Sequence, residues 1–554
     1  VDLDEALPEE WIGRAGFNFE LFPGHLFGKS WIMDQQAGTF AVQPNGPISE
    51  RAGEWLNEPL ARGSKLVIAP EEDLQRMVIE ARKGTLELID GRSNHNNGWY
   101  IVHTPIPAGA TKNAIEWIIT PHTVEGWARP PVIQVSQLGY AQEQSKRIVI
   151  EQGRKDTAAG EISLLRLGES GPEKVASSTV EPWGKFLRYQ YFTWDFSATK
   201  ESGMYVAEYR GQRSNPFRIG DDVFSRHAWQ PTLEYYLPVQ MCHMRVNEKY
   251  RVWHGLCHHD DALMSPVNLN HFDGYISGPS TLTEFEPMQP VPGLNRGGWH
   301  DAGDYDLRVE SQMGTVWLLA MMVEQFGLDY DATRIDQENQ VVEIHQPDGR
   351  NDALQQVEHG LLSVLGAYES MGRLYRGIIT PTLRQYVMLG DGSVQTDNRV
   401  HDASDGSSVA DDRWVFTEQN PGRELNAAGG LAAAARVLRG YNDDLSTRAL
   451  KAAVAVYQAA SESAEPLTRQ RAFALTELFL ATSDSGYLDA LVAMRKEIEE
   501  SIAETGWIIG RVMPKIGDAG FTAGIDRAVA AHQEKVRNDS GLTPYGVPYK
   551  PHIW

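Results

Sequence analysis

Apolar residues along the chain follow two different periods, and the change between them falls near residue 223. Before that point, short apolar stretches such as Lys65–Ala69, Ala114–Ile119 and Arg147–Ile150 are separated by turns rich in Gly, Pro and Asn. Such stretches predict β-strands. After it, apolar residues recur every three or four positions, which is the period of an amphipathic helix. This pattern predicts helices over 226–247, 308–327, 351–373, 424–440, 444–462, 466–483, 485–503 and 523–537.

The order of these elements predicts three domains. Residues 1–128 are typical of a β-rich, sandwich-like domain, and residues 129–222 have the short, evenly spaced strands of a second β-sandwich. Residues 223–554 form a helical domain, in which consecutive helix pairs favour an (α/α)-barrel. A chain of 554 residues is also too long for one hydrophobic core, so several domains are expected.

Charge and hydropathy exclude two classes of partner. The chain has 74 acidic and 51 basic residues, a formal charge of −23. Nucleic acids and anionic membrane surfaces attract basic patches, so we expect neither as a partner. No run of about 18 apolar residues is present, so no membrane span is predicted. The first residue is Val1, with neither a Met nor a signal peptide before it, and we expect a processed or trimmed form.

Two acidic residues in the middle of the chain are the strongest candidates for chemistry. Asp301 and Asp304 lie three residues apart and are flanked by three rings, those of Trp299, His300 and Tyr305. Aromatic rings stack on the C–H faces of a sugar, while carboxylates bind its hydroxyl groups. The alternative is an Asp-rich turn that caps the helix after it, because Asp favours such positions. On the residues alone, both interpretations stay open.

The stretch 297–304, Gly-Gly-Trp-His-Asp-Ala-Gly-Asp, resembles the signature of glycoside hydrolase family 9, which contains inverting cellulase-type enzymes. The resemblance implies an (α/α)6-type catalytic barrel preceded by an immunoglobulin-like module, and a β-1,4-glucan as the default substrate. It also implies that Asp304 is the catalytic base and that Asp301 helps to bind the attacking water. One departure is Arg308, which stands where a lysine is frequent in such enzymes. The expected substrate contacts are Trp299, His300, Tyr305 and, on a later loop, Trp414.

The general acid of the family is a glutamate in an Asn-Glu motif near the end of the barrel. No Asn-Glu pair stands in the C-terminal part of the predicted barrel, and the last segment resembles a loop inside the family's domain. We therefore expect a barrel that is incomplete at its C-terminal end, with the acid either outside this chain or at a residue that the sequence does not single out. Glu424 falls in the first turn of a predicted helix, where the helix dipole lowers a carboxyl pKa and makes it a poor acid. Glu418 is an equally weak candidate.

Two Cys-His pairs predict a metal site. Cys242-His243 and Cys257-His258 contain the only two cysteines of the chain. Two thiolates and two imidazoles suit a closed, tetrahedral, structural zinc, and some bacterial family 9 enzymes similarly carry zinc on paired Cys-His dipeptides. A single disulfide and two buried thiols are the alternatives. A second, acidic stretch offers oxygen ligands for calcium, although its spacing matches no calcium loop and a solvated surface is the simpler interpretation; its residues are Asp402, Asp405, Asp411 and Asp412.

Together these features predict a secreted or periplasmic glycoside hydrolase that cleaves a β-linked polysaccharide or oligosaccharide. One rival is a polysaccharide lyase on an α/α-toroid, for which His359 and Tyr368 share a predicted helix. The other is a non-catalytic glycan-binding protein, which the missing acid would favour. The sequence determines neither the exact glycan, nor exo or endo action, nor the oligomeric state.

Overall fold

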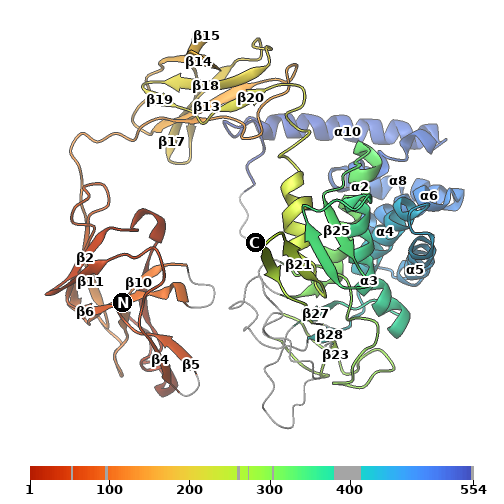
Figure 1. Cartoon of the computed structure of the whole chain (residues 1–554), viewed down its shortest axis with the longest axis horizontal. Coiled ribbons are helices and arrows are strands. Elements are labelled where there is room, and N and C mark those ends of the chain that lie inside the picture. The colour runs from red at the N-terminus through yellow and green to blue at the C-terminus, as the bar shows by residue number, and fades with distance from the viewer. Residues whose placement is uncertain are drawn as a thin grey trace. The chain divides into compact units, whose positions relative to one another are not determined.

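The computed structural model describes residues 1–51, 54–93, 98–258, 262–271, 274–301, 305–379 and 413–550 (Figure 1). Its contacts divide the chain into two compact units, Val1–Ala128 and Arg129–Trp554. Within the described ranges, none of the helices combines the length and the apolar character that a bilayer span requires.

The first unit is built from two antiparallel sheets and a hairpin. The first sheet has the order β1-β10-β9-β6, with strands Gly16–Leu21, Tyr100–Pro105, Leu86–Asp90 and Ala61–Gly63. The second has the order β11-β8-β7-β2-β3, with strands Glu116–Pro121, Met77–Lys83, Lys65–Ile68, Ser30–Met33 and Gln36–Thr39. The hairpin joins β4 (Ile48–Arg51) to β5 (Glu54–Asn57).

Alternating burial along the strands explains why these residues form sheets. Along β9, every second residue is fully buried, and Leu86 and Leu88 join a core that contains residues of both sheets, among them Met33 and Leu66. Period-two alternation places these side chains on one face of each sheet. One buried ion pair, Asp90 with Arg92 at 2.8 Å, adds a polar contact inside the unit.

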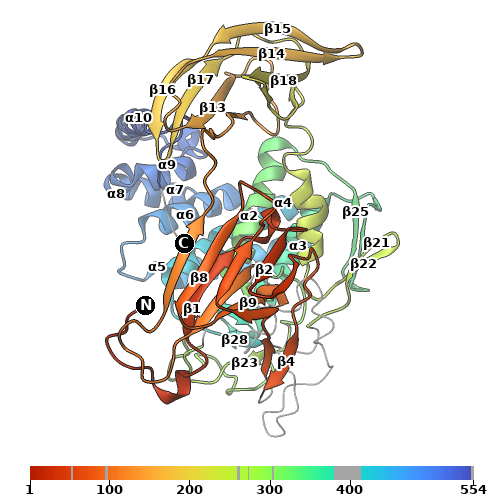
Figure 2. The same ribbon diagram turned by 90° about the vertical axis from the view of Figure 1, so that its left-hand side faces the viewer.

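The second unit begins with another pair of sheets. One has the order β12-β13-β17-β16, with strands Val132–Gln134, Arg147–Gly153, Tyr189–Asp195 and Glu181–Phe186. The other has the order β15-β14-β18-β19, with strands Gly171–Thr179, Glu161–Gly168, Gly203–Tyr209 and Gln212–Arg213, and β20 (Phe217–Ile219) also pairs with β18. Figure 2 shows the long hairpin of β14 and β15. Phe192 of one sheet and Tyr205 of the other belong to the same buried core.

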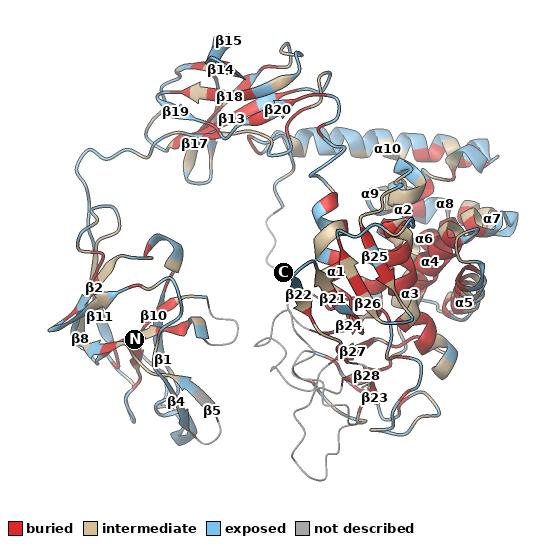
Figure 3. Ribbon diagram, viewed as in Figure 1, coloured by how far each residue is buried: buried red, intermediate tan, exposed pale blue. Residues whose placement is uncertain are grey.

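The remainder of the second unit is mainly helical. The helices are α1 (Leu237–Gln240), α2 (Val309–Phe326), α3 (Asp352–Met371), α4 (Pro421–Leu438), α5 (Asp443–Ser461), α6 (Thr468–Thr482), α7 (Ser485–Ala493), α8 (Arg495–Glu500), α9 (Ile502–Ile509) and α10 (Ala519–Ser540). Helix α4 contacts α2, α5 and α6, and Figure 3 colours most of it as buried. The chain is therefore β-rich in its N-terminal part and helical in its C-terminal part, as predicted.

Small residues allow α4 to lie close to its neighbours. A side chain at Gly430 would place its Cβ 2.9 Å from the carbonyl oxygen of Met313 on α2, and one at Gly429 would lie 2.4 Å from the ring of Phe473 on α6. Real Cβ atoms do not approach other atoms this closely. The Ala- and Gly-rich composition of α4 is thus what lets it occupy the centre of the helical region.

Two of the predicted helices differ from the observed structure. In 226–247, a π-helical turn over Thr232–Tyr236 continues into α1, and the chain then forms the strands β21 (Arg245–Glu248) and β22 (Arg251–His254). Strand β21 pairs in parallel with β26 (Val341–Ile344), and this distant partner overrides the local helical period. The predicted helix 485–503 is divided among α7, α8 and α9.

Two small sheets support the loops that carry the candidate chemistry. One has the order β22-β21-β26-β25, where β25 is Thr333–Asp336. The other has the order β23-β28-β27-β24, with strands Leu263–Met264, Trp414–Phe416, Gly377–Ile379 and Leu307–Arg308. The second sheet brings Leu307 and Arg308, just after the Asp301–Asp304 stretch, beside Gly377 and Ile378, about 70 residues further along the chain.

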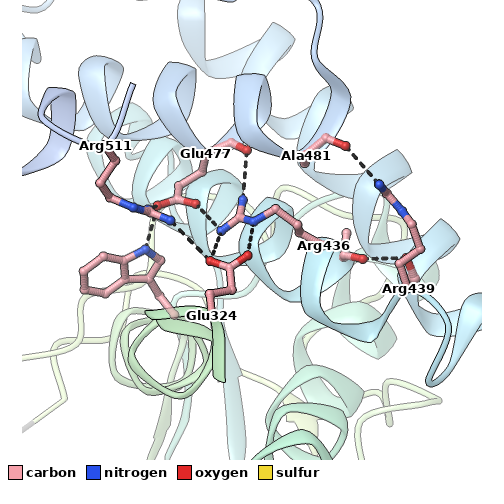
Figure 4. A network of polar contacts seen from close by, with 9 residues as sticks. Glu324, Arg436, Arg439, Glu477, Ala481 and Arg511 are labelled. Atoms are coloured by element: carbon pink, nitrogen blue, oxygen red, sulfur yellow. Dashed lines mark hydrogen bonds and ion pairs between the residues drawn. The ribbon is translucent and has the colours of Figure 1, made fainter. Parts of the chain in front are cut away.

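A network of four charged residues, of which Glu477 is buried and the other three are partly buried, joins the helices (Figure 4). Glu324 of α2 and Glu477 of α6 pair with Arg436 of α4 and with Arg511, and the Arg436–Glu477 contact is 2.9 Å long. The indole nitrogen of Trp317 also donates to Glu477, at 2.8 Å. Because two carboxylates face two guanidinium groups, the charges of this network cancel.

Candidate active site and metal cluster

The candidate site begins with two glycines that no other residue could replace. Gly297 and Gly298 have φ angles of 73° and 82°, in the left-handed region that favours glycine. A Cβ at Gly297 would lie 2.4 Å from the carbonyl oxygen of His359. The Gly298 N–H donates to that oxygen at 3.1 Å, and the His359 Nε2–H donates to the Gly298 oxygen at 2.8 Å. Helix α3 therefore fixes the start of the motif.

His359 has a structural position in this arrangement. It is fully buried, and burial lowers its pKa to about 3, so its imidazole is neutral at ordinary pH. A neutral, buried ring that donates to the backbone is not placed to abstract a proton from a substrate. The lyase interpretation, which relied on His359, therefore loses its candidate base.

Trp299 is held on both its backbone and its indole ring. Gln312 of α2 accepts from the Trp299 N–H at 2.9 Å and donates to the Trp299 oxygen at 2.8 Å. The indole N–H donates to Gln356 of α3 at 2.8 Å. The side chain is 4% exposed. The tryptophan of the motif is thus locked between two helices.

Burial limits which predicted substrate contacts could touch a sugar. His300 and Tyr305 are 8% and 2% exposed, and Trp299 is equally enclosed. A buried ring offers no face to a sugar, so the structure places these three side chains in the core of the site rather than on an open surface. Trp414, on β28, is partly exposed and remains the predicted sugar platform.

Asp301 is a partly exposed carboxylate at the end of the buried segment. Its side chain is 30% exposed, and Oδ2 lies 3.3 Å from Nε of Arg308. Its backbone N–H donates to the oxygen of Asp306 at 3.0 Å, which closes the loop 301–306. Asp304 lies outside the described residues, and so do the predicted calcium ligands Asp402, Asp405, Asp411 and Asp412.

Four buried side chains gather next to Asp301. One ligand atom from each lies within 4.8 Å of the others; the residues are Cys242, Cys257, His258 and His300. The Cys242 Sγ to His258 Nδ1 distance is 3.6 Å and the Cys257 Sγ to His300 Nε2 distance is 3.7 Å. A tetrahedral zinc with bonds of about 2.0–2.3 Å separates its ligand atoms by roughly 3.3–3.8 Å. Both the donor types and these distances fit such an ion.

The gathered set differs from the predicted one in a single member, because His300 takes the place of His243. Arg413 donates to Nε2 of His243 at 3.1 Å, and a guanidinium cannot accept. Nε2 therefore accepts, and the Nδ1–H of His243 donates to the Gly297 oxygen at 2.9 Å. Both ring nitrogens of His243 thus have partners outside the group, although Nε2 also lies 3.9 Å from Sγ of Cys242, so His243 borders the four gathered residues.

Sequence reasoning missed both His300 as a member of the group and Arg413 as its neighbour. Arg413 is fully buried, and it also donates to the Tyr305 oxygen at 2.9 Å. His300 reaches the cysteines because its N–H donates to the Gln240 oxygen at 2.8 Å, while the Cys242 N–H donates to the Gly298 oxygen at 2.9 Å. Only the contact between 240–242 and 298–300 reveals this, and the sequence has no local signal for it.

Electrostatics of the group favour a bound cation. Burial raises the pKa of the Cys242 thiol and lowers the pKa of His258 well below its usual range. Both residues are therefore neutral when no cation is present. A divalent ion would stabilise the thiolates that burial alone disfavours, and it would bind the neutral imidazoles through their lone pairs.

The pKa of Glu424 moves in the opposite direction from the one predicted. Burial raises it, although Arg373, 4.0 Å away, acts against this shift. The helix-dipole argument failed because the first turn of α4 is enclosed rather than solvated. Glu418 forms ion pairs with Arg376, at 3.8 Å, and with Arg423.

Comparisons with known proteins agree with this geometry. The family model for glycosyl hydrolase family 9 matches residues 228–516. A metagenome-derived family 9 endoglucanase is similar in structure with a TM-score of 0.53 and 19% identity, over 76% of this chain and 75% of that chain. A family 9 protein of Bacteroides ovatus has a TM-score of 0.55 and 20% identity over the same shares.

A third solved structure is a Zn-binding triple mutant of the family 9 endoglucanase J30, with a TM-score of 0.53 and 17% identity over 73% of each chain. No curated protein matches the chain. At these identities the structural likeness shows a shared fold. The family model covers more than half of the chain and includes the whole stretch from the metal cluster to α9. The chain therefore belongs to glycosyl hydrolase family 9 and is a glycoside hydrolase.

Proposed function

We propose that this hydrolase cleaves a β-1,4-glucan, or a closely related β-linked glycan, with inversion at the anomeric carbon. The observation that carries the proposal is Asp301, a partly exposed carboxylate held by Arg308 in the family's Asp-Ala-Gly-Asp motif. The similar solved structures include endoglucanases, which supports glucan as the substrate class.

In the proposed mechanism, Asp304 removes a proton from the attacking water and Asp301 holds that water by a second hydrogen bond. The assignment of Asp304 rests on the resemblance of the motif. An inverting enzyme also needs a carboxylic acid roughly 6.5–9.5 Å from the base, with room for water between them. Asp301 and Asp304 are too close in sequence to fill both roles. We assign the acid to no described residue.

We also propose that the group Cys242, Cys257, His258 and His300 holds a structural zinc ion. Two thiolates and two imidazoles would close its coordination sphere, so it would stabilise the loop rather than react. The Zn-binding relative supports this choice of metal. His300 precedes Asp301 directly, so the ion would fix the backbone from which the catalytic loop starts.

The β-sandwich at residues 129–222 is proposed to be an immunoglobulin-like module that braces an (α/α)-barrel. Two ring contacts support a bracing role: Tyr191 with Tyr545, at 6.0 Å, and Phe186 with Tyr549, at 5.2 Å. They connect this sandwich to the segment after α10. Secretion or export to the periplasm is proposed from the family's usual substrate.

The test is proton NMR of cello-oligosaccharide cleavage by the zinc-loaded protein, compared with Asp304→Asn. We expect the α-anomer to appear first, and we expect the variant to lose about 10²–10⁴-fold in kcat, which is typical for loss of a general base. Asp222→Asn, an exposed carboxylate that pairs with Arg218, is the control and should keep its rate.

Three outcomes would contradict the proposal. A β-anomer formed first would indicate a retaining mechanism. An unsaturated product that absorbs ultraviolet light would indicate a lyase. Binding of cello- or chito-oligosaccharides without any product would indicate a glycan-binding protein.

A further inference from the structure

Arg308 connects the candidate catalytic loop to a buried carboxylate. Its Nη2 donates to Oδ2 of Asp306 at 3.2 Å, and its Nε lies 3.3 Å from Oδ2 of Asp301. Asp306 is fully buried, whereas the side chain of Asp301 is 30% exposed. One guanidinium therefore bridges an inner carboxylate, which cannot move, and an outer carboxylate, which faces the solvent.

The same loop is closed a second time through its backbone. The Asp301 N–H donates to the Asp306 oxygen at 3.0 Å. This bond fixes the backbone of Asp301, yet it leaves the side-chain torsions free. The contact with Arg308 restricts those torsions. The backbone bond thus fixes the position of the Asp301 main chain, and the Arg308 contact orients its carboxylate.

Arg308 is itself held in place. It belongs to β24, where it pairs with Gly377 of β27. Its guanidinium lies 5.6 Å from the ring centroid of Tyr275, which is 3% exposed. A Cβ at Gly377 would lie 3.0 Å from that ring, so the glycine leaves the space that the tyrosine occupies. The sheet, the ring and Asp306 thus orient the guanidinium before it meets Asp301.

We propose that Arg308 is a positioning residue of the hydrolase, which aims the Asp301 carboxylate at the attacking water from its anchor on Asp306. The inference rests on the proposed function for its catalytic meaning. The planar fork of arginine can contact two carboxylates at once, while an ammonium is a point charge on a flexible stem. This geometry gives a reason for an arginine where the family often has a lysine.

The first measurement compares kcat and KM on a cello-oligosaccharide for Arg308→Gln, Arg308→Lys and wild type. A misplacement of about 1 Å in a catalytic group can cost about 100-fold. We expect Arg308→Gln to lose about 10–100-fold in kcat with KM nearly unchanged, and Arg308→Lys to lose less. Added guanidinium should restore part of the rate of Arg308→Gly.

Arg376→Gln is the matched control. Arg376 also lies over Tyr275, at 4.5 Å, but its carboxylate partner is Glu418 rather than Asp301. The kcat of Arg376→Gln should stay within about twofold of wild type, because this partly exposed ion pair does not include Asp301. An Arg308→Gln variant with the wild-type kcat, or a control that loses as much rate, would overturn the proposal.

A second measurement does not depend on catalysis. In a double-mutant cycle of Arg308→Gln and Asp301→Asn, we expect the loss in Tm of the double variant to be smaller than the sum of the two single losses. Additive losses would show that the two side chains do not interact and would overturn the bridge. If wild type cleaves no glycan, the proposed function fails, and the cycle still decides whether the bridge exists.

Discussion

Two polar clusters of this hydrolase, one partly and one fully buried, differ in the partner that each needs in order to be stable. In the helix network, Glu324 and Glu477 face Arg436 and Arg511, so two negative charges meet two positive ones. Near the candidate active site, the cluster of Cys242, Cys257, His258 and His300 consists of two thiols and two imidazoles, and burial disfavours the charged forms of Cys242 and His258. The first cluster is complete within the protein. The second has the donors for a cation, and under the proposed zinc site it would gain its full stability only with one.

The difference follows from the chemistry of the groups. Arginine and glutamate are charged in water and remain charged when paired in the interior, provided that each partner is present. A thiol is uncharged at neutral pH and becomes a strong ligand only as a thiolate, which a metal stabilises. We therefore expect loss of one charged partner to destabilise the helix network, and loss of a metal to destabilise the cysteine-histidine cluster.

The largest effect should come from Cys257→Ser. Without one thiolate, the tetrahedral site loses most of its affinity, and the folding free energy supplied by the metal is lost with it. We expect less than stoichiometric zinc and a Tm lower by roughly 10 °C or more. Elemental analysis and thermal unfolding of protein purified without chelator measure both. A variant with full zinc content, or a wild type that binds none, would contradict the proposed site.

Replacing each histidine in turn tests which four residues form the site. His300→Gln should remove the metal, whereas His243→Gln should retain it with an affinity lowered by about 10–100-fold, as for a residue next to the ligands. The reverse result would restore the set predicted from the Cys-His pairs. It would also show that the contact of His243 with Arg413 does not persist when metal is bound.

An intermediate effect is expected when the helix network is broken. Glu477→Gln would leave Arg436 and Arg511 to share Glu324, and an incompletely paired buried charge costs about 3–5 kcal/mol. The control is Arg448→Gln, because Arg448 pairs with Glu369 at 2.8 Å on the surface and such pairs contribute at most about 1 kcal/mol. Urea unfolding measures both. Equal losses would mean that burial does not strengthen the network.

The helices that were predicted well from the sequence are those with local signals. The predictions 351–373 and 444–462 agree with α3 and α5 within about two residues. Each of these helices has a strong apolar period and an asparagine cap: Asn351 accepts from the Leu354 N–H, and Asn442 accepts from the Leu445 N–H. The prediction 226–247 was wrong after Gln240, where α1 ends and the chain leads into β21, because β21 depends on β26, about a hundred residues away.

The same distinction applies to the site. Both cysteines and His258 could be found from the repeated Cys-His pairs, since a pair is a local feature. The choice of His300 over His243 could not, because it depends on Arg413, which lies about 170 residues from His243 in the chain. The rise in the pKa of Glu424 was also invisible, because it comes from burial rather than from the position of Glu424 in its helix.

Asp352 offers a third case to set beside the two clusters, because it is a buried carboxyl group whose hydrogen bonds come from backbone N–H groups. It is 1% exposed and accepts from the Ala332 and Thr333 N–H groups at 3.0 Å and 3.2 Å. In the part of the chain that the structure describes, neither Arg nor Lys pairs with it. Burial raises its pKa from 3.8 to about 7. Asp352 should therefore take up a proton within the ordinary range of pH.

The sign of the effect follows from linkage. Because the pKa of Asp352 is higher in the folded protein than in the unfolded chain, its contribution to stability is complete below about pH 4 and is lost as the pH rises through about 7. The loss should amount to roughly 2–4 kcal/mol. Asp352→Asn cannot titrate, so the stability difference between wild type and this variant should shrink by that amount from pH 4 to pH 7.5, as measured by urea unfolding.

Asp336→Asn is the control, because the pKa of Asp336 is shifted in the opposite direction, downward. A hydrogen bond from the side chain of Asn339 lowers the pKa of Asp336, so this carboxylate stays ionised between pH 4 and pH 7.5, and the difference between this variant and wild type should be nearly constant. A constant difference for Asp352→Asn as well would mean that its two backbone N–H donors are enough to keep a buried carboxylate charged. In that case a buried acidic group would need no cation, and only the cysteine cluster would depend on one, because backbone N–H donors cannot replace a metal there.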